Sequence, residues 1–455
     1  MKVVIFGTGC FFHKYKKFID IATVDCLLDN SETKNHTIIE GKMVYYPNEI
    51  NLDECDYVLI MIERYSEVVQ QLLCLGVTNE KIKTYRDIAQ LYNMTLEVQS
   101  NAGMISLEEW VGSHKKKIFI LSHSSTRSGV PIALMNLSVL LRKMGWAVLY
   151  GSMEEGNISL ELQKNNVDYV ENLQLWGSFD KLRDSLQKFD MLIVGTLVLS
   201  EQGVALAKLN IPILWWLHES DRNLFEHHLL PTGNENIHYY AVGNRVVNCF
   251  REFYPDEPID NLLYFLLENN WKQRKKSDCF TFACIGWYGK GKGQDILLKA
   301  IELMTSAVRK KMRVIMVAPG WDTAVTKPKQ MIEVQWIGEI SQEEIEMLYN
   351  NIDVLVCPSR CDSMPIVVSQ ALQNHIPCIV SDQVGQSVFF EHQYGGYVFE
   401  NENASQLAER MTYCINNPEV IKTKGEEAYD IFKCNFSEQI MKQKIEEIIK
   451  SYGDS

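Results

Sequence analysis

Residues 354–386 read VLVCPSRCDSMPIVVSQALQNHIPCIVSDQVGQ, and this stretch decides the fold of the C-terminal part of the chain. Two short apolar runs, 354–357 and 376–381, have the composition of buried parallel strands. Between them, apolar residues recur at the spacing of one helix face, at Val367, Val368, Ala371 and Leu372. The pattern predicts a strand–helix–strand unit.

Two polar loops, 358–365 and 382–386, follow these strands. Parallel strands end at the same edge of a sheet, so we expect the loops to lie side by side at the edge where open α/β sheets bind ligands. The start of the intervening helix offers N–H donors and a partial positive charge, which suit sugar hydroxyls and phosphates. The candidate groups are the side chains of Asp362 and Ser363 and the backbone amides of Met364, Ile366 and Val367. From spacing alone, Asp362 could equally be a helix cap.

The same stretch resembles the signature of the retaining glycosyltransferases of family four, which have the two-domain GT-B fold. Their pattern is Pro-Ser, two residues, an acid, seven residues, then Glu-Ala. Pro358, Ser359 and Asp362 match it, whereas Gln370 and Ala371 stand at the Glu-Ala pair. The resemblance implies that Asp362 holds donor-sugar hydroxyls and that Gln370 faces the ribose. Gln370 offers one acceptor and one donor where a carboxylate accepts from two hydroxyls, which predicts weaker ribose binding.

The segment 286–295, GWYGKGKGQD, resembles the family's donor-phosphate loop, in which an arginine and a lysine hold the diphosphate. The residues that match are Gly286, Lys292, Gly293 and Asp295. Trp287 stands where the arginine belongs, and Lys290 could substitute for it as a flexible point charge. The segment 335–340 resembles the part that packs on the nucleotide base. The resemblance therefore predicts a donor site made of Gly129, Gly286, Lys290, Lys292, Gly338, Ser363, Met364, Pro365, Ile366, Val367 and Gln370.

A second strand–loop–helix pattern begins at residue 118, and its loop, HSSTRSGVP at 123–131, resembles the family's first glycine-rich loop. Gly129 would let donor phosphate or acceptor approach the backbone, and Arg127 could hold a phosphate or remain solvated. Farther on, the buried run 211–217 ends in His-Glu-Ser-Asp, and polar residues at a strand end point to the ligand edge. His218 matches the family histidine that faces the donor sugar. Taken alone, it could be a hydrogen-bonded structural histidine.

Residues 1–92 predict a small separate domain that begins with a strand at 3–6 and a Gly7-Thr8-Gly9 turn. It resembles the Rossmann-like domain fused to some polysaccharide-biosynthesis transferases. A dinucleotide fingerprint would have glycine where Phe12 stands, although an acid, Asp29, is present about 20 residues past the glycines. Two interpretations stay open: a nucleotide site at Gly7, Gly9 and Asp29, or a turn kept for packing.

Composition narrows the class of protein. A net charge of −13 argues against a nucleic-acid binder. The 12 cysteines have no Cys-x-x-Cys spacing, which argues against zinc and is typical of reduced core residues in the cytoplasm. The longest notable apolar run, 211–217, is far shorter than the roughly 20 residues of a membrane helix. We therefore expect a cytoplasmic protein with at most peripheral contact at the inner membrane face.

A length of 455 residues suggests about three domains. The predicted class is α/β: two Rossmann-like GT-B domains facing a cleft, plus the small Rossmann-like domain at the N-terminus. The predicted boundaries are an accessory domain at 1–92, a linker at 93–115, an acceptor domain at 116–268, a donor domain at 269–435 and a closing helix and tail at 436–455. Residues 262–267 are expected to form the last strand of the acceptor domain, and 268–278 the hinge.

The predicted function is retaining transfer of a hexose-type sugar from a nucleoside diphosphate sugar to a hydroxyl of a glycan, lipid-linked or protein acceptor. The resemblance implies that neither metal nor another cofactor is needed, and it favours polysaccharide or cell-surface glycan synthesis. One alternative is an inactive nucleotide-sugar-binding scaffold for a partner transferase, which Trp287 and Gln370 favour. Nucleotide-sugar epimerases and glycogen-type phosphorylases share the architecture and are further alternatives.

Overall fold

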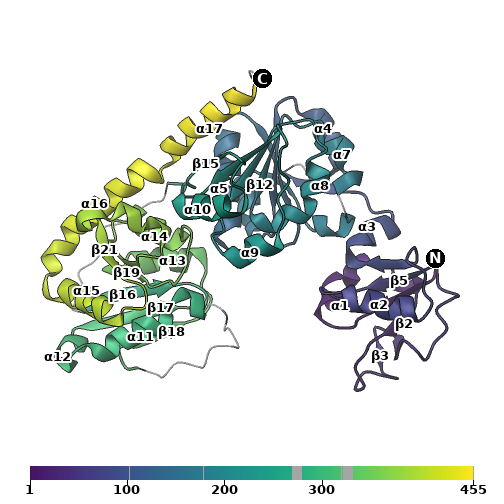
Figure 1. The fold of residues 1–455 in the computed structure, drawn as a ribbon, viewed down its shortest axis with the longest axis horizontal. Coiled ribbons are helices and arrows are strands. Elements are labelled where there is room, and N and C mark those ends of the chain that lie inside the picture. Colours follow the sequence, from purple (N-terminus) through teal and green to yellow (C-terminus); the bar gives the residue numbers. More distant parts are fainter. Residues whose placement is uncertain (102, 178, 269–278, 319, 321–330, 454–455) are drawn as a thin grey trace.

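The computed structural model describes residues 1–101, 103–177, 179–268, 279–318, 320 and 331–453. The described residues form three sheets, each in its own lobe (Figure 1). We call these the N-terminal, middle and C-terminal lobes. The predicted fold class is confirmed: two Rossmann-like lobes of mainly parallel sheet follow a smaller α/β lobe.

The N-terminal lobe has a six-stranded sheet in the order β3-β4-β2-β1-β5-β6. Its central strand β1 is completely buried and pairs in parallel with both neighbours, as a continuous apolar run should. The strands are β1 (Val3–Phe6), β2 (Val24–Leu28), β3 (Ile38–Ile39), β4 (Lys42–Tyr45), β5 (Tyr57–Ile60) and β6 (Ile82–Thr84), and the α-helices are α1 (Cys10–Tyr15), α2 (Ser66–Cys74) and α3 (Ile88–Leu91).

One of the two apolar clusters of this lobe is completed by the middle lobe. A short 3₁₀ helix there, η4 (Leu173–Trp176), places the fully buried Leu175 in the cluster that contains Tyr15 and Tyr85. Gln174 Nε2 donates a hydrogen bond of 2.7 Å to the hydroxyl of Tyr15. Ion pairs surround this contact: Lys14 with Glu154 at 2.9 Å, Lys17 with Glu155 at 2.7 Å and Arg86 with Glu201 at 2.5 Å. The first lobe is therefore docked on the second through shared core as well as charge.

The middle lobe has a nine-stranded sheet in the order β15-β14-β13-β12-β9-β10-β11-β7-β8. All pairs are parallel except the two that involve β7. The strands are β7 (Glu97–Ser100), β8 (Gly103–Ser106), β9 (Lys117–Ser122), β10 (Ala147–Ser152), β11 (Asp168–Val170), β12 (Met191–Gly195), β13 (Ile213–Leu217), β14 (Ile237–Ala241) and β15 (Ile259–Asn261). The α-helices are α4 (Leu107–Ser113), α5 (Gly129–Lys143), α6 (Ile158–Lys164), α7 (Arg183–Leu186), α8 (Gly203–Leu206), α9 (Arg222–His227) and α10 (Asn244–Phe253).

The predicted linker at 93–115 is wrong, because the described part of that segment forms the β7–β8 hairpin and α4. The hairpin adds to the sheet edge through β11, and α4 buries Trp110, whose Nε1 donates to Asp168 at 2.8 Å. Short edge strands bury few side chains, so most of their residues are polar. The alternation of apolar and polar residues that marks a strand is therefore not visible in the sequence. The segment belongs to the middle lobe.

The predicted strand at 262–267 is also wrong, because the last strand of this sheet, β15, ends at Asn261. Residues 262–267 leave the sheet as an extended, mostly buried segment. The carbonyl of Phe265 accepts from Asn136 at 3.1 Å, and the amide of Leu266 donates to Phe436 at 3.0 Å. The segment is apolar because it is buried between α5, which carries Asn136, and the end of α16 (Pro418–Asn435), which Phe436 follows. The predicted hinge at 268–278 lies, apart from its first residue, outside the described residues.

The C-terminal lobe has a parallel six-stranded sheet in the order β18-β17-β16-β19-β20-β21. The strands are β16 (Phe280–Ile285), β17 (Met312–Val317), β18 (Val334–Ile337), β19 (Val354–Cys357), β20 (Cys378–Ser381) and β21 (Gly396–Phe399), and the α-helices are α11 (Gln294–Leu303), α12 (Ser306–Arg309), α13 (Gln342–Tyr349), α14 (Ile366–Gln373), α15 (Ala404–Asn416) and α16 (Pro418–Asn435). The strand–helix–strand unit predicted from 354–386 is β19, α14 and β20.

The closing helix α17 (Glu438–Gly453) crosses from the C-terminal lobe back along the middle lobe (Figure 1). Lys143 pairs with Glu438 at 2.8 Å, near the start of the helix. Near its end, the ring of Tyr452 stacks on His238 with ring centroids 4.4 Å apart. Among the described helices, none has both the length and the apolar composition needed to cross a membrane.

Candidate active site

The two polar loops that follow β19 and β20 lie against each other, as the sequence predicts. Asp362 and Val384 form a parallel bridge, and the amide of Gly385 donates to the carbonyl of Asp362 at 3.0 Å. A Cβ placed on Gly385 would lie 1.7 Å from the carbonyl oxygen of Ser363. Only glycine permits this approach, which fixes the signature loop at the carboxyl edge of the sheet.

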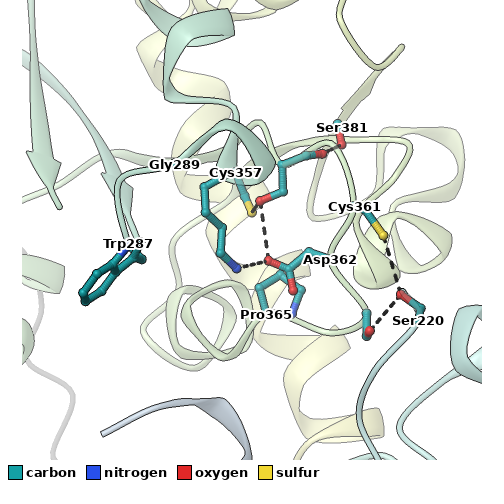
Figure 2. A network of polar contacts seen from close by, with 12 residues as sticks. Ser220, Trp287, Gly289, Cys357, Cys361, Asp362, Pro365 and Ser381 are labelled. Carbon is teal, nitrogen blue, oxygen red and sulfur yellow. Dashed lines mark hydrogen bonds and ion pairs between the residues drawn. The ribbon is translucent and has the colours of Figure 1, made fainter. Parts of the chain in front are cut away.

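Asp362 forms an ion pair with Lys292, whose Nζ lies 2.6 Å from Oδ2 (Figure 2). The carboxylate is 14% exposed, and Ser359 Oγ donates to it at 3.5 Å. Burial lowers the pKa of Lys292, but the charge and the hydrogen bond of Asp362, with smaller contributions from Cys357 and Cys284, together raise it above its usual value. The lysine therefore carries a full positive charge beside the signature acid.

Asp362 does not cap the helix. Pro365 is the N-cap residue of α14, and no side chain bonds there. The first helical hydrogen bond runs from Val368 to the carbonyl of Pro365 at 3.1 Å. The amides of Ile366 and Val367 precede it and are donors of the first turn. The alternative of a simple helix cap is thereby removed.

A cavity of about 600 Å³ opens between the middle and C-terminal lobes, and most of the predicted donor site lines it. The predicted residues it brings together are Gly129, His218, Gly286, Lys292, Asp362, Ser363, Met364, Pro365, Ile366, Val367 and Gln370. They come from strand ends and helix starts of both lobes. One wall of the cavity, with Lys292 and the start of α14, belongs to the C-terminal lobe, and the other wall, with His218, belongs to the middle lobe. The lobes touch beside it, where Ser363 Oγ donates to Ser220 Oγ at 2.9 Å (Figure 2).

Two predicted donor residues do not line this cavity. Lys290 is exposed in the short helix η7 (Lys290–Lys292), and its carbonyl accepts from Arg360 at 2.5 Å. Arg360 also forms two bonds of 2.8 Å with Asp295, which locks the lysine loop onto the signature loop. Gly338 follows β18, and its neighbours Glu339 and Ile340 reach the cavity instead.

Gln370 and Trp287, the two residues that differ from the family pattern, lie in different environments. The hydroxyl of Tyr349 donates to Gln370 Oε1 at 3.1 Å, so the amide oxygen already has a partner within the protein. Trp287 is 58% exposed, and its indole points away from the Lys292–Asp362 pair (Figure 2). Arg127, another predicted phosphate ligand, pairs with Glu161 on α6.

His218 follows β13 and its ring packs on Trp216 with centroids 4.8 Å apart. Burial, followed by the charge of His123, lowers the pKa of His218 to about 3. His218 Nε2 is buried and, within the described part of the chain, has no hydrogen-bond partner. The imidazole is therefore neutral at ordinary pH and offers a hydrogen-bonding atom that the protein leaves unused.

Three further polar residues of this wall were missed by the sequence reasoning: His123, Thr196 and Glu219. Glu219 accepts from the hydroxyl of Thr196 and from the amides of Leu197, at 3.0 Å, and His218, at 3.1 Å. Thr196 has a φ of 86°, which is rare for a β-branched residue and is found at functional sites. Glu219 thus organises the strand ends. His123 and Thr196 each directly follow a buried strand, the signal that singled out His218.

In the N-terminal lobe, Gly7, Gly9 and Asp29 share a cavity of about 340 Å³. Burial raises the pKa of Asp29, but hydrogen bonds from Thr8 and Lys34 outweigh this and lower it. The carboxylate also accepts from the amides of Thr8, at 3.1 Å, and Ser31, at 3.0 Å. Gly7 has a φ of +101°, and a Cβ there would lie 2.6 Å from Ile62. These contacts favour the packing interpretation of the turn; the nucleotide site stays a prediction.

Comparison with known proteins agrees with this geometry. Residues 267–430 match the family model described as "Glycosyl transferases group 1", and residues 114–234 match "Glycosyl-transferase family 4". Residues 1–83 match "C2185-like, N-terminal". The N-terminal lobe is thus matched separately from the two lobes that form the cavity.

Individual relatives each match part of this chain. An "Uncharacterized glycosyltransferase" of Haemophilus influenzae is 18% identical over 67% of this chain and 92% of its own length. One from Methanocaldococcus jannaschii is 23% identical over 50% of this chain and 65% of its own length. The crystal structure of HepE from Anabaena in complex with UDP-glucose has a TM-score of 0.63 at 16% identity, over 74% of this chain and all of HepE. Because the two glycosyltransferase models together match more than half of the chain and the fold is GT-B, the chain belongs to the group 1 and family 4 glycosyltransferases.

Proposed function

We propose that this glycosyltransferase moves a hexose-type sugar from a nucleoside diphosphate sugar to an acceptor hydroxyl, with retention of the anomeric configuration. The observation that carries the proposal is the Lys292–Asp362 pair of 2.6 Å at the start of α14, inside the interlobe cavity. A diphosphate would take Lys292 and the first-turn amides, and the sugar hydroxyls would take Asp362.

In the reaction, the bond between the anomeric carbon and the diphosphate oxygen breaks, and its electron pair leaves with the diphosphate. The acceptor oxygen forms the new bond to the anomeric carbon, and its proton passes to the departing diphosphate oxygen. Negative charge grows on the diphosphate, where Lys292 and the amides of Ile366 and Val367 would stabilise it. We propose that these groups meet the charge without a metal, so excess EDTA is expected to leave the rate unchanged.

His218 would contact the sugar from the middle lobe. Since its imidazole is neutral, it would act as a hydrogen-bonding group and not as an acid. Closure of the two lobes on the donor would exclude water, whose attack would waste the donor. Polysaccharide or cell-surface glycan synthesis, on the cytoplasmic side of the membrane, is our proposal for the setting. It is supported by the accessory domain, which resembles those fused to polysaccharide transferases.

The test is release of nucleoside diphosphate from a panel of nucleotide sugars, beginning with UDP-glucose because HepE was crystallised with it. We expect slow hydrolysis of one donor by the unmodified protein. Asp362→Ala or Lys292→Ala should reduce it by about 100-fold or more. Lys299→Ala, on the exposed side of α11, is the matched control and should retain the rate. If Lys292→Ala hydrolyses donor as fast as Lys299→Ala, the assigned donor site is wrong.

The competing proposal is an inactive scaffold that binds nucleotide sugars for a partner transferase. The Tyr349–Gln370 hydrogen bond favours it, since it uses one of the two lone pairs of an oxygen that the ribose would use. Donor binding without turnover, in the presence of acceptor candidates, would support the scaffold. Conversion of the donor sugar without any acceptor would instead indicate an epimerase.

A further inference from the structure

The wall of the cavity that faces the donor loops contains a second histidine with the same defect as His218. His123 directly follows β9 and lines the cavity. Its Nδ1 is buried and, over the residues that the structure describes, has no hydrogen-bond partner. Leaving a buried polar atom unpaired costs about 1–3 kcal/mol, so such atoms in a folded protein call for a ligand or a structural reason.

The strand order brings the two histidines to the same edge of the sheet, where both line the cavity. The neighbours β9, β12 and β13 end in His123, Thr196 and His218, so the histidines sit two strands, or roughly 10 Å, apart along the sheet edge. The charge of His123 contributes to the depressed pKa of His218, which also places the rings within electrostatic range of each other. The sheet therefore presents a pair of imidazoles and not a single one.

Three other polar residues of this wall, Arg127, Thr196 and Glu219, already have partners in the protein. Arg127 pairs with Glu161, and Thr196 bonds to Glu219, which also holds two backbone amides. By contrast, His123 Nδ1 and His218 Nε2 have no hydrogen-bond partner among the described residues. With no fixed partner to set its tautomer, a neutral imidazole can either donate or accept, and a sugar hydroxyl does both.

We infer that His123 is a second sugar-binding residue, which together with His218 holds hydroxyls of the transferred sugar against the Lys292–Asp362 wall. This inference rests on the proposed function and adds one residue to it. It assigns part of the sugar-dependent binding to the middle lobe, beside the contact from Asp362, whereas the nucleoside diphosphate is bound by the C-terminal lobe.

The test separates the two parts by calorimetric titration of the full chain with a nucleoside diphosphate and with its sugar derivative. UDP and UDP-glucose come first, followed by UDP-galactose, UDP-N-acetylglucosamine and the GDP and GDP-mannose pair. The quantity measured is the ratio of the two dissociation constants. His123→Ala should reduce the sugar-dependent gain in affinity about three- to tenfold while changing UDP affinity less than about twofold.

Two variants sharpen the test. His123→Gln keeps an amide that donates and accepts, and should recover part of the gain. His227→Ala removes an exposed histidine of α9, whose Nδ1 contacts the Asn223 carbonyl at 2.7 Å, and should leave both affinities unchanged.

An undiminished gain in His123→Ala would overturn the inference. Equal loss of UDP and UDP-glucose affinity would also overturn it, because it would show a structural role. The inference would also be overturned if the unmodified protein bound UDP but bound none of the sugar derivatives more tightly than the corresponding free diphosphate. Failure of the unmodified protein to bind any diphosphate would be a different result, since it would remove the proposed function itself and the inference with it.

Discussion

Lys292 and Asp362 hold each other before any donor arrives, and this sets how the two residues respond to substitution. The pair is only partly screened by water, since the carboxylate is 14% exposed. Lys292→Ala leaves the carboxylate of Asp362, which is 14% exposed, without its partner. Asp362→Asn leaves the charge of Lys292, which is 42% exposed, and an amide oxygen that can still accept a hydrogen bond from it. Asp362→Asn should therefore disturb folding less than Lys292→Ala, although both should impair donor binding.

His218 makes stability depend on pH. In the unfolded chain a histidine binds a proton below about pH 6.5, whereas the folded His218 does so only near pH 3. The unfolded state therefore binds more protons between these values, and stability falls as the pH falls. From pH 6.5 to 5, His218 should account for a loss of up to about 2 kcal/mol, and His123, whose pKa burial also lowers, adds to it.

Urea unfolding at pH 6.5 and pH 5 checks this effect. His218→Asn should lose less stability on acidification than the unmodified protein, and His227→Asn should lose as much as the unmodified protein. Identical acid losses in all three would show that His218 is not buried in a neutral form.

At this scale the sequence predicted the residues that a family pattern marks. Asp362, Lys292 and His218 were found because a motif fixes their spacing, and the structure brings them into one cavity. His123, Thr196 and Glu219 were missed because their importance depends on which strands are neighbours. Lys290 was predicted as a substitute cation, but sequence spacing cannot show that Arg360 holds its carbonyl on the outer side of the loop.

At the scale of elements, the site depends on two loops that approach more closely than side chains allow. Gly293 has a φ of +70°, and a Cβ there would lie 1.9 Å from the carbonyl oxygen of Pro358. Arg360 reinforces the contact through Asp295 and through its own amide, which donates to Gly291 at 2.8 Å. The lysine loop and the signature loop therefore move as one unit.

Substitution of the two loop glycines tests this unit. Gly293→Ala must shift the backbone of the signature loop, and should cost about 2–3 kcal/mol and lower the melting temperature by about 5–10 °C. Gly291→Ala should change stability by less than about 1 kcal/mol, because a Cβ there meets nothing within 4 Å. Equal melting temperatures for the two variants would contradict the close packing of the loops.

Strands could be predicted where burial on both faces of the sheet gives a continuous apolar run. β1 and β19 were predicted with their observed bounds, since each is a continuous apolar run followed by a polar loop. The β7–β8 hairpin has the composition of a linker, because its edge strands of four residues carry polar side chains. The segment 262–267 has the composition of a strand, because burial between lobes selects the same apolar residues as burial in a sheet.

Over the whole molecule, one of the two apolar clusters of the N-terminal lobe includes a residue of the middle lobe, whereas the other consists of its own residues. Leu175 is fully buried in the first cluster, yet it belongs to the middle lobe. Leu175→Ala should destabilise the N-terminal lobe by about 2–4 kcal/mol. Loss of hydrogen-exchange protection in β1, without a change in the C-terminal lobe, would report it. Leu160→Ala, at a side chain 63% exposed, is the control, and equal protection in both variants would contradict a shared core.

The shared core also affects how the chain folds during translation. The sheet of β1 to β6 leaves the ribosome first, but the side of Tyr15 remains uncovered until Leu175 and Trp176 have been synthesised. At ordinary rates of protein synthesis that delay is roughly 4–17 s after residue 92 has been added. During this interval an apolar surface next to the nascent chain is open to chaperones, and the first lobe to be made completes its folding only with the second.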